Sequence, residues 1–275
     1  MSKQKENKDK RNIYKVACVV FSLAFLIIVG IMIRNWWVEK AAQKQFEELQ
    51  QSVEFVEPET EGNTEVDVLA QLGIDPMEKN LNWDELKETN EHIYAWIYIP
   101  GTNVDYPVLQ HPTDDTYYLD YNLDGTKGYP GCIYSEHRYN STDWTDFNTL
   151  LYGHNMKNGT MFRTLHNYED RAFFEENRYI YIYTPEHVYV YDIFAAYANE
   201  AKHILVVYDN STPDGRRQYL DDLFGIRSMS AHFRDGVEVT TDSNILTLVT
   251  CISGQPNQRY FVQGVLVNPV GEVTE

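Results

Sequence analysis

Cysteine is scarce in this sequence, with three residues among 275: Cys18, Cys132 and Cys251. That number is too low for the disulfide-dense scaffold of a small secreted domain, although a single bridge between Cys132 and Cys251 stays open as an alternative. There is no CxxC or HxxxH spacing and the eight histidines are scattered, so we predict no metal site and no cofactor. A free cysteine then acts either as a small core residue or as a reactive thiol.

Basic side chains are also few, because 23 Lys and Arg stand against 41 Asp and Glu, for a net charge of −18. Residues 1–15 carry six of the basic and two of the acidic side chains, and Arg34 is a further basic one. Residues 35–275 therefore keep 16 basic and 39 acidic side chains. Phosphate contacts need patches of lysine and arginine, so nucleic acid is excluded as the expected partner.

One long apolar run lies near the N-terminus. Residues 16–33 read VACVVFSLAFLIIVGIMI, eighteen residues without a charge, which is enough for a membrane-spanning helix. No small-x-small cleavage pattern follows, and Trp36 and Trp37 stand where an aromatic belt anchors a helix end. By the positive-inside rule, the sequence predicts a single-pass cell-membrane protein with a cytoplasmic tail (1–15), an anchor (16–37) and an extracellular remainder.

Beyond the anchor, the composition predicts an acidic stalk over 38–74 and one folded domain over 75–275. Much of the stalk is rich in Glu and Gln, with EPETEGNTE inside it, and has too few apolar residues to form a core. The first part of the domain carries Leu81, Leu86 and Ile93 at mixed three- and four-residue spacings. This spacing predicts short N-terminal helices that dock on the segment that follows.

After Tyr94 the pattern changes to short aromatic and β-branched runs separated by Gly, Pro, Asn and Asp. The runs are AWIYIPG, VDYPVLQ, GCIYSE, NTLLYGH, YIYIYTP, HVYVYDIFAAYA, ILTLVTC and YFVQGVLV. Such runs predict a mainly β fold, either a barrel or a sandwich. Residues 212–229 (TPDGRRQYLDDLFGIRSM) interrupt them with a helical pattern, which predicts a helix inserted before the run that ends in Cys251.

Three residues from separate segments are candidates for nucleophilic chemistry. Cys251 ends the strand-type run NILTLVTC, and a thiol there needs a partner that carries protons. His154 follows a glycine that breaks the apolar run 150–152. The turn residues of ISGQPNQ predict a chain reversal that returns Arg259 to the same sheet end as Cys251. Each residue taken alone has an ordinary structural interpretation, as a core cysteine, an incidental histidine and a surface arginine.

Taken together, the segments resemble the class B sortases, the membrane-anchored cysteine transpeptidases of Gram-positive bacteria. The resemblance rests on YGHNMKNGTMF at 152–162, on TLVTC at 247–251 and on an arginine eight residues later. It implies an eight-stranded sortase-type β-barrel with N-terminal helices and a helix inserted before the catalytic strand. It also implies that His154, Cys251 and Arg259 are the catalytic residues.

The same resemblance implies substrate contacts around the catalytic residues. These residues are Tyr152, Asn155, Val249, Thr250 and Ile252. One of them departs from the family pattern, because members commonly carry serine two residues before the cysteine and this chain has Val249. The hydroxyl of that serine is absent here.

The implied reaction is cleavage of a C-terminal sorting signal after threonine, through a thioacyl intermediate, and transfer of the surface protein to an amine of the peptidoglycan precursor. The implied signal is of the NPxTN kind or a related proline-containing pentapeptide ending in TG. A pilin-polymerising transpeptidase, a hydrolytic cysteine protease and a non-catalytic binding module with the same fold are alternatives. An L,D-transpeptidase has its cysteine in an SHGC-type context, which TLVTCISG does not match.

Overall fold

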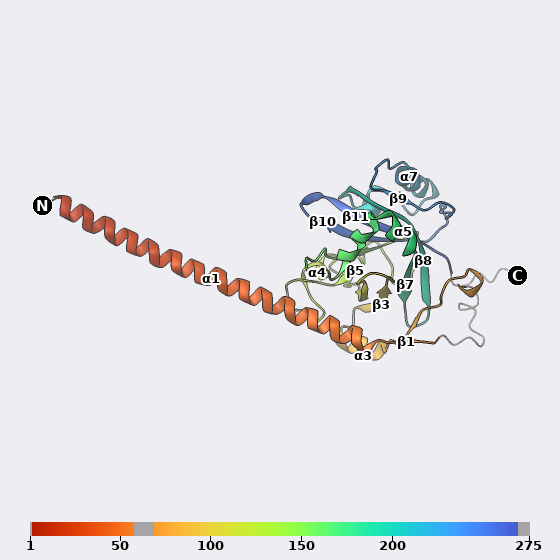
Figure 1. Cartoon of the computed structure of the whole chain (residues 1–275), viewed down its shortest axis with the longest axis horizontal. Coiled ribbons are helices and arrows are strands. Elements are labelled where there is room, and N and C mark those ends of the chain that lie inside the picture. Colours follow the sequence, from red (N-terminus) through yellow and green to blue (C-terminus); the bar gives the residue numbers. More distant parts are fainter. Residues whose placement is uncertain (1, 58–68, 269–275) are drawn as a thin grey trace.

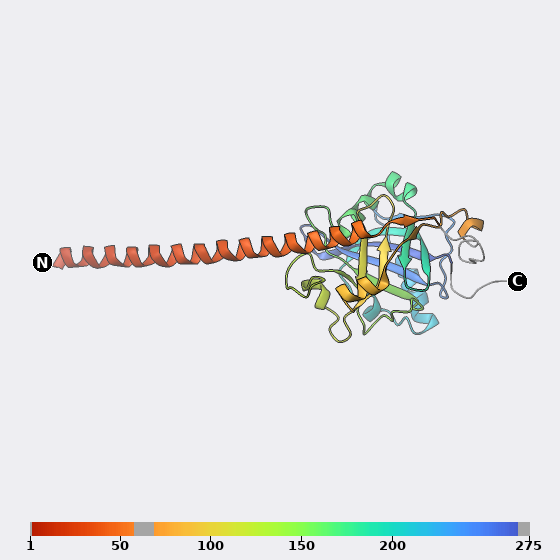
Figure 2. The same cartoon turned by 90° about the horizontal axis from the view of Figure 1, so that it is seen from below.

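The computed structural model describes residues 2–57 and 69–268, with side chains from Tyr14 onward. Figures 1 and 2 show one long helix, α1 (Ser2–Ser52), that leads to a body built mainly of strands. From Tyr14 onward α1 is long and apolar enough to cross a membrane, and its most apolar stretch is not buried against the body. The part of the predicted stalk at 58–68 lies outside the described residues.

The body contains the following elements. Its strands are β1 (Phe55–Val56), β2 (Glu78–Lys79), β3 (Ile93–Tyr98), β4 (Asp105–Leu109), β5 (Ile133–Tyr134), β6 (Asn148–Tyr152), β7 (Tyr179–Tyr183), β8 (Val188–Glu200), β9 (His232–Phe233), β10 (Ile245–Ile252) and β11 (Gln255–Leu266). Its helices are α3 (Trp83–Thr89), α4 (Tyr117–Asp120), the 3-10 helix η1 (Phe162–Glu169), α5 (Arg171–Glu176), α6 (Ile204–Val207) and α7 (Pro213–Phe224).

Eight of the strands close into a barrel. Their order is β11-β10-β6-β5-β4-β3-β7-β8, and β8 pairs with β11 to complete the ring. β9 adds to the outside of this ring by pairing with β8, and β1 pairs with β2 separately. The eight runs predicted as strands are the eight barrel strands, so the predicted fold class is confirmed. β9 was not predicted, because two residues are too short to carry a period.

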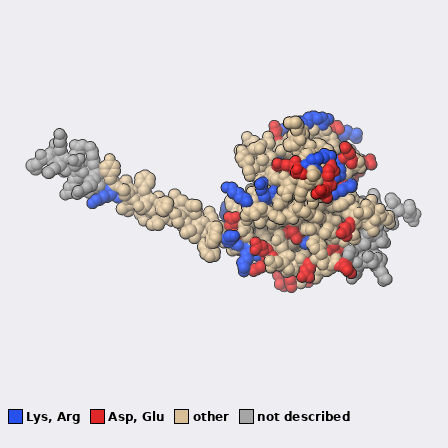
Figure 3. Space-filling model, in the orientation of Figure 1, with Lys and Arg blue, Asp and Glu red and all other residues tan. Residues whose placement is uncertain are grey.

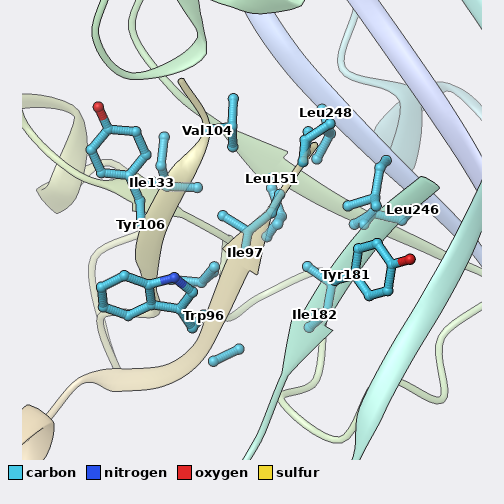
Figure 4. Close-up of a cluster of buried hydrophobic side chains, with 14 of the residues drawn as sticks. Trp96, Ile97, Val104, Tyr106, Ile133, Leu151, Tyr181, Ile182, Leu246 and Leu248 are labelled. Atoms are coloured by element: carbon cyan, nitrogen blue, oxygen red, sulfur yellow. The ribbon is translucent and has the colours of Figure 1, made fainter. Parts of the chain in front are cut away.

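Alternate side chains of the strands fill the barrel interior. Figure 4 shows Ile97, Leu151, Ile182, Leu246 and Leu248 meeting there from four different strands. All five are fully buried. Truncation of such a side chain to alanine costs about 2–5 kcal/mol, so this cluster is a main source of stability.

A second apolar cluster lies on the outer face of the barrel, under α7. Leu150 of β6 and Ile245 and Val249 of β10 pack there against the buried side of the helix. Residues two apart in a strand share a face, so Cys251 is the next residue on this side of β10. It is exposed, so the cover provided by α7 reaches Val249 and leaves Cys251 open.

The helix predicted at 212–229 is present as α7, but it is shorter than predicted. Thr212 caps its N-terminus, and a proline occupies the first turn, where it costs no hydrogen bond. The helix ends at Phe224, because the following residue is Gly225, a weak helix former that stands at the C-cap. Residues 225–229 therefore lie beyond the helix.

The last turns of α1 dock on the barrel, within the segment predicted as a stalk. Phe46 is 4% exposed, and its ring meets that of Tyr106 edge-on with the centroids 5.4 Å apart. Gln50 Nε2 donates to the main-chain oxygen of Asp105 at 2.6 Å. The low apolar content of the segment predicted no packing, yet one aromatic ring on the barrel side of a helix is enough for this contact.

The predicted N-terminal helices are present in part. Leu86 lies in α3 and is buried, whereas Ile93 begins β3 and residues 78–79 form β2. The boundaries 38–74 and 75–275 stay predictions.

Candidate active site

The parallel pairing of β6 with β10 brings His154 and Cys251 to the same end of the barrel. Tyr152 is the register partner of Val249. His154 and Cys251 each lie two residues beyond this pair in the same chain direction, and the side-chain period of a strand is two. Both side chains therefore project from the outer face of the barrel, at the end where β6 and β10 finish.

Gly153 allows the two chains to stay close after β6 ends at Tyr152. Its N–H donates to the oxygen of Val249 at 3.2 Å, and its own carbonyl accepts from Thr250 Oγ1 at 2.8 Å. A Cβ at this position would lie 2.5 Å from Ile133 Cδ1 and 2.6 Å from Phe162 Cδ2. The break predicted from the sequence is thus a close approach that only glycine fits.

Cys251 and Arg259 lie directly opposite each other in the antiparallel pair of β10 and β11. Residues opposite in such a pair project to the same face, so the guanidinium stem starts beside the thiol. The chain reverses at Gly254, whose φ of +77° suits glycine, and β11 begins at Gln255. The turn is therefore tighter than the segment 252–258 suggested, and it returns Arg259 as predicted.

The imidazole of His154 is oriented by α4 and by the segment that follows this helix. Its Nε2 lies 2.7 Å from the main-chain oxygen of Leu119, and the ring of Tyr129 meets it edge-on at 5.1 Å. A carbonyl oxygen only accepts, so Nε2 carries the hydrogen in this contact. Nδ1 is then the nitrogen that is left to exchange protons with a reacting group.

Arg259 is half-buried, and its guanidinium is held by its own strand. Nη1 donates to the oxygens of Pro256 at 3.0 Å and Gln258 at 2.8 Å. These two bonds use the hydrogens of Nη1, and the planar fork has further N–H groups on Nε and Nη2. The side chain is therefore positioned and still has donors for a ligand.

The three cysteines differ in their surroundings, and all three are free. Cys132 is 1% exposed, its Sγ lies 3.5 Å from the oxygen of Tyr121, and burial raises the pKa of its thiol well above the usual range. Cys18 lies on α1. The alternative of a bridge between Cys132 and Cys251 is wrong, and Cys132 fits the core interpretation.

The five residues predicted to contact substrate fall into two groups. Val249 is 5% exposed and Thr250 is 2% exposed, so both side chains are buried. Tyr152, Asn155 and Ile252 are half-buried and have surface open to a ligand.

Two side chains not singled out in the sequence flank the hydroxyl of Tyr152. Glu136 Oε2 accepts from this hydroxyl at 3.2 Å and lies 2.5 Å from His203 Nε2. Burial raises the pKa of Tyr152, which keeps the hydroxyl neutral and able to donate. Glu136 and His203 are 67 residues apart, so no local pattern pointed to their contact.

Two further side chains hold the main chain of Cys251. Asn155 Nδ2 donates to its carbonyl oxygen at 2.8 Å, and His166 Nε2 lies 3.0 Å from the same oxygen. Asn155 was predicted as a substrate contact from its place in the motif. His166 gave no signal, because it is 85 residues from Cys251 in sequence.

The register of β6, β10 and β11 therefore brings a thiol, an imidazole and a guanidinium to the same end of the barrel. A thiol can attack a carbonyl carbon, an imidazole can move the protons, and a guanidinium can stabilise an oxyanion. Within 2–57 and 69–268, no group of three or more His, Cys, Asp or Glu side chains is placed to hold a metal ion.

Comparison with known proteins identifies relatives that cover the barrel and this site. The family model of the sortase domain matches residues 97–267. Sortase B of Listeria monocytogenes is 31% identical over 185 residues, which cover 66% of this chain and 73% of that protein. The X-ray structure of Clostridium perfringens sortase B has a TM-score of 0.60 at 31% identity and covers 67% of this chain and 99% of its own. Sortase B of B. anthracis, in complex with AAEK1, has a TM-score of 0.62 at 26% identity and covers 86% and 98%.

Proposed function

Because the chain belongs to the sortase family and to its class B, we propose that it cleaves a C-terminal sorting signal after threonine through a thioacyl intermediate on Cys251 and joins the surface protein to a cell-wall amine. The family is a class of cysteine transpeptidases. The observation that carries this proposal is the convergence of Cys251, His154 and Arg259 on one face and one end of the barrel. The signal is of the NPxTN kind or a proline-containing pentapeptide ending in TG.

In the first half-reaction, the sulfur of Cys251 attacks the carbonyl carbon of the threonine. A C–S bond forms, and the carbonyl oxygen becomes an oxyanion. Arg259 stabilises this charge with a fixed fork of donors that stays protonated. The C–N bond then breaks, and His154 gives a proton to the leaving amine.

The second half-reaction reverses the proton movement. The acceptor amine attacks the thioacyl carbon and passes a proton to His154, and Cys251 leaves as the thiolate. A new amide joins the surface protein to the peptidoglycan precursor. The substrate contacts lie at Tyr152, Asn155 and Ile252. Val249 and Thr250 are buried and support these residues by packing.

The apolar part of α1 anchors the enzyme in the cell membrane. In both cartoon views, α1 leaves the body at the end where the β10–β11 turn and α4 lie (Figures 1 and 2). Figure 3 shows basic side chains gathered where α1 meets this end of the body. With residues 1–15 in the cytoplasm and 16–37 in the bilayer, the active site faces the outer membrane surface, where membrane-bound substrates are presented.

The reaction is tested with the full-length protein in detergent micelles. Peptides of both signal types are incubated with and without a free primary amine and followed by mass spectrometry. We expect cleavage after threonine and, with the amine, a new amide product. A hydrolysis product that is insensitive to the amine would identify a hydrolytic protease, and binding without cleavage would identify a binding module. Preference for a lysine-bearing pilin peptide as the amine would identify a pilin polymerase.

Substitution of Arg259 separates its geometry from its charge. Lysine keeps the charge but loses the planar fork, and alanine loses both. We expect Arg259→Ala and Arg259→Lys to lower kcat/KM by at least about tenfold, with alanine worse, because loss of an oxyanion donor costs about 10²–10³ in turnover.

Arg217→Lys, on the exposed side of α7, is the matched control and should keep normal kinetics. Normal rates in Arg259→Lys would mean that charge alone suffices, and normal rates in Arg259→Ala would assign the oxyanion to other donors.

A further inference from the structure

Asn155 and His166 converge on one oxygen, the main-chain carbonyl of Cys251. Asn155 comes from the segment after β6, and His166 comes from η1. Their distances to the oxygen are 2.8 Å from Asn155 Nδ2 and 3.0 Å from His166 Nε2. Neither residue belongs to the catalytic set derived above, yet both contact the backbone of the attacking residue.

This carbonyl lies where the regular strand pairing breaks. The register of β10 with β11 shifts between Cys251 and Ile252, because Cys251 pairs with Arg259 and Ile252 with Gln255. Such a bulge changes the direction of the neighbouring side chains and interrupts the regular hydrogen bonds between the two strands. Side chains from η1 and from the segment after β6 hold the backbone at Cys251 instead.

The imidazole of His166 is itself fixed on three sides. Its Nδ1 lies 2.7 Å from Glu169 Oε1, its ring stacks on Tyr260 with the centroids 4.9 Å apart, and its side chain is 11% exposed. Tyr260 is buried and directly follows Arg259 in β11. The ring is therefore held between the strand of the arginine and the strand of the cysteine.

Both ring nitrogens of His166 face acceptors. Nδ1 faces a carboxylate oxygen of Glu169, and Nε2 faces the carbonyl of Cys251. A neutral imidazole donates through one nitrogen only, whereas an imidazolium donates through both. Nε2 also lies 3.2 Å from Asn155 Nδ2, so the ring is joined to Glu169, to Asn155 and to the carbonyl of Cys251 whichever nitrogen carries the hydrogen.

We propose that His166 is a positioning residue of the transpeptidation reaction: its imidazole, held by Glu169 and Tyr260, contacts the carbonyl of Cys251 and, with Asn155, fixes the backbone that carries the attacking sulfur. This role deepens the proposed function and rests on it.

The other charged and titratable groups around the pair are few. Arg163 of η1 reaches Asn155 Oδ1 from Nη1 at 3.4 Å, and His232 Nε2 of β9 lies 2.9 Å from the main-chain oxygen of Glu169. Burial raises the pKa of Tyr260 on β11, so the stacked phenol stays neutral. Of the side chains that touch the imidazole itself, Glu169 is the one that carries a charge.

The test compares wild type with His166→Gln and His166→Ala in the full-length protein. Glutamine keeps an N–H donor. We expect His166→Ala to lower kcat by about tenfold to a hundredfold with KM changed less than about threefold, the scale of a misplaced reacting group. His166→Gln should recover at least about threefold of that kcat, because its amide can still donate to the carbonyl of Cys251.

The matched control is His187→Gln. His187 precedes β8, whose far end, at Glu200, pairs with Gln258 near the active site, so His187 lies at the opposite end of the barrel. This variant should keep the wild-type kcat and KM. Glu169→Gln removes the charge that holds Nδ1 and should lower kcat in the same direction as His166→Ala. Thermal melting checks the fold of each variant.

Alkylation of Cys251 by iodoacetamide, located by mass spectrometry, measures the same effect without any substrate. If His166→Ala alkylates more slowly than the wild type but the wild type transfers no peptide, the role of His166 stands and the transpeptidase function is rejected. Wild-type rates in both assays for folded His166→Ala and Glu169→Gln would overturn the role of His166. If His166→Ala does not fold, Glu169→Gln decides.

Discussion

Cys251→Ala is expected to abolish cleavage and transfer of a sorting-signal peptide while leaving the fold intact. The sulfur forms the thioacyl bond, and Cys132, the other free cysteine of the body, is buried. Because Cys251 is exposed and lies beyond the cluster under α7, its truncation removes no core packing. The rate should fall to the uncatalysed level, and the melting temperature should stay within a few degrees, a shift that corresponds to about 1 kcal/mol or less.

Cys132→Ala is the matched control. Its thiol is buried and its pKa is raised, so it should neither react nor support turnover. We expect this variant to keep the wild-type kcat with a somewhat lower melting temperature, because a buried sulfur is lost. Iodoacetamide should label Cys251 in the wild type. Labelling of Cys132 together with activity in Cys251→Ala would reassign the nucleophile.

His154→Ala is expected to lower kcat by about 10² or more, the scale of lost general acid–base catalysis. The leaving amine then departs without a proton, and the acceptor amine has no base. Wild-type kcat/KM should follow a bell-shaped pH profile, since the reaction needs a thiolate and an imidazolium together. Kinetics across the pH range with one peptide and one amine measure both effects.

His187→Ala, at the far end of the barrel, should leave the rate and the profile unchanged. A His154→Ala enzyme with a normal rate and an unchanged pH profile would remove this histidine from the mechanism. A parallel loss in both variants would point to a general effect on folding, which melting curves detect.

The strands of the barrel could be predicted from the sequence because each is a local pattern. Aromatic and β-branched runs bounded by Gly, Pro, Asn and Asp mark all eight strands, and Gly153 marks the end of β6. The return of Arg259 to Cys251 is also local, because a short turn joins two adjacent strands. The resemblance to class B sortases supplied the roles of these residues.

Boundaries and weak contacts could not be predicted in the same way. The helix at 212–229 was placed correctly, but a single glycine at its C-cap ended it early. The helical end of α1 looked like a spacer, because one aromatic side chain, Phe46, is too little apolar surface to register in composition. Whether one such side chain packs depends on the surface that it meets, which here is the ring of Tyr106 on the barrel.

The sequence by itself determined which segments form strands, where the long apolar segment lies and which residue types are available for thiol chemistry, because these follow from local periodicity and composition. Only the tertiary structure decided that β6 lies parallel to β10, so that His154 meets Cys251 across 97 residues of chain, and that His166 holds the carbonyl of the same cysteine. Parallel pairing and contacts between distant side chains leave no period in the sequence. They arise when burial of the barrel interior fixes one register among the many that the strands could adopt.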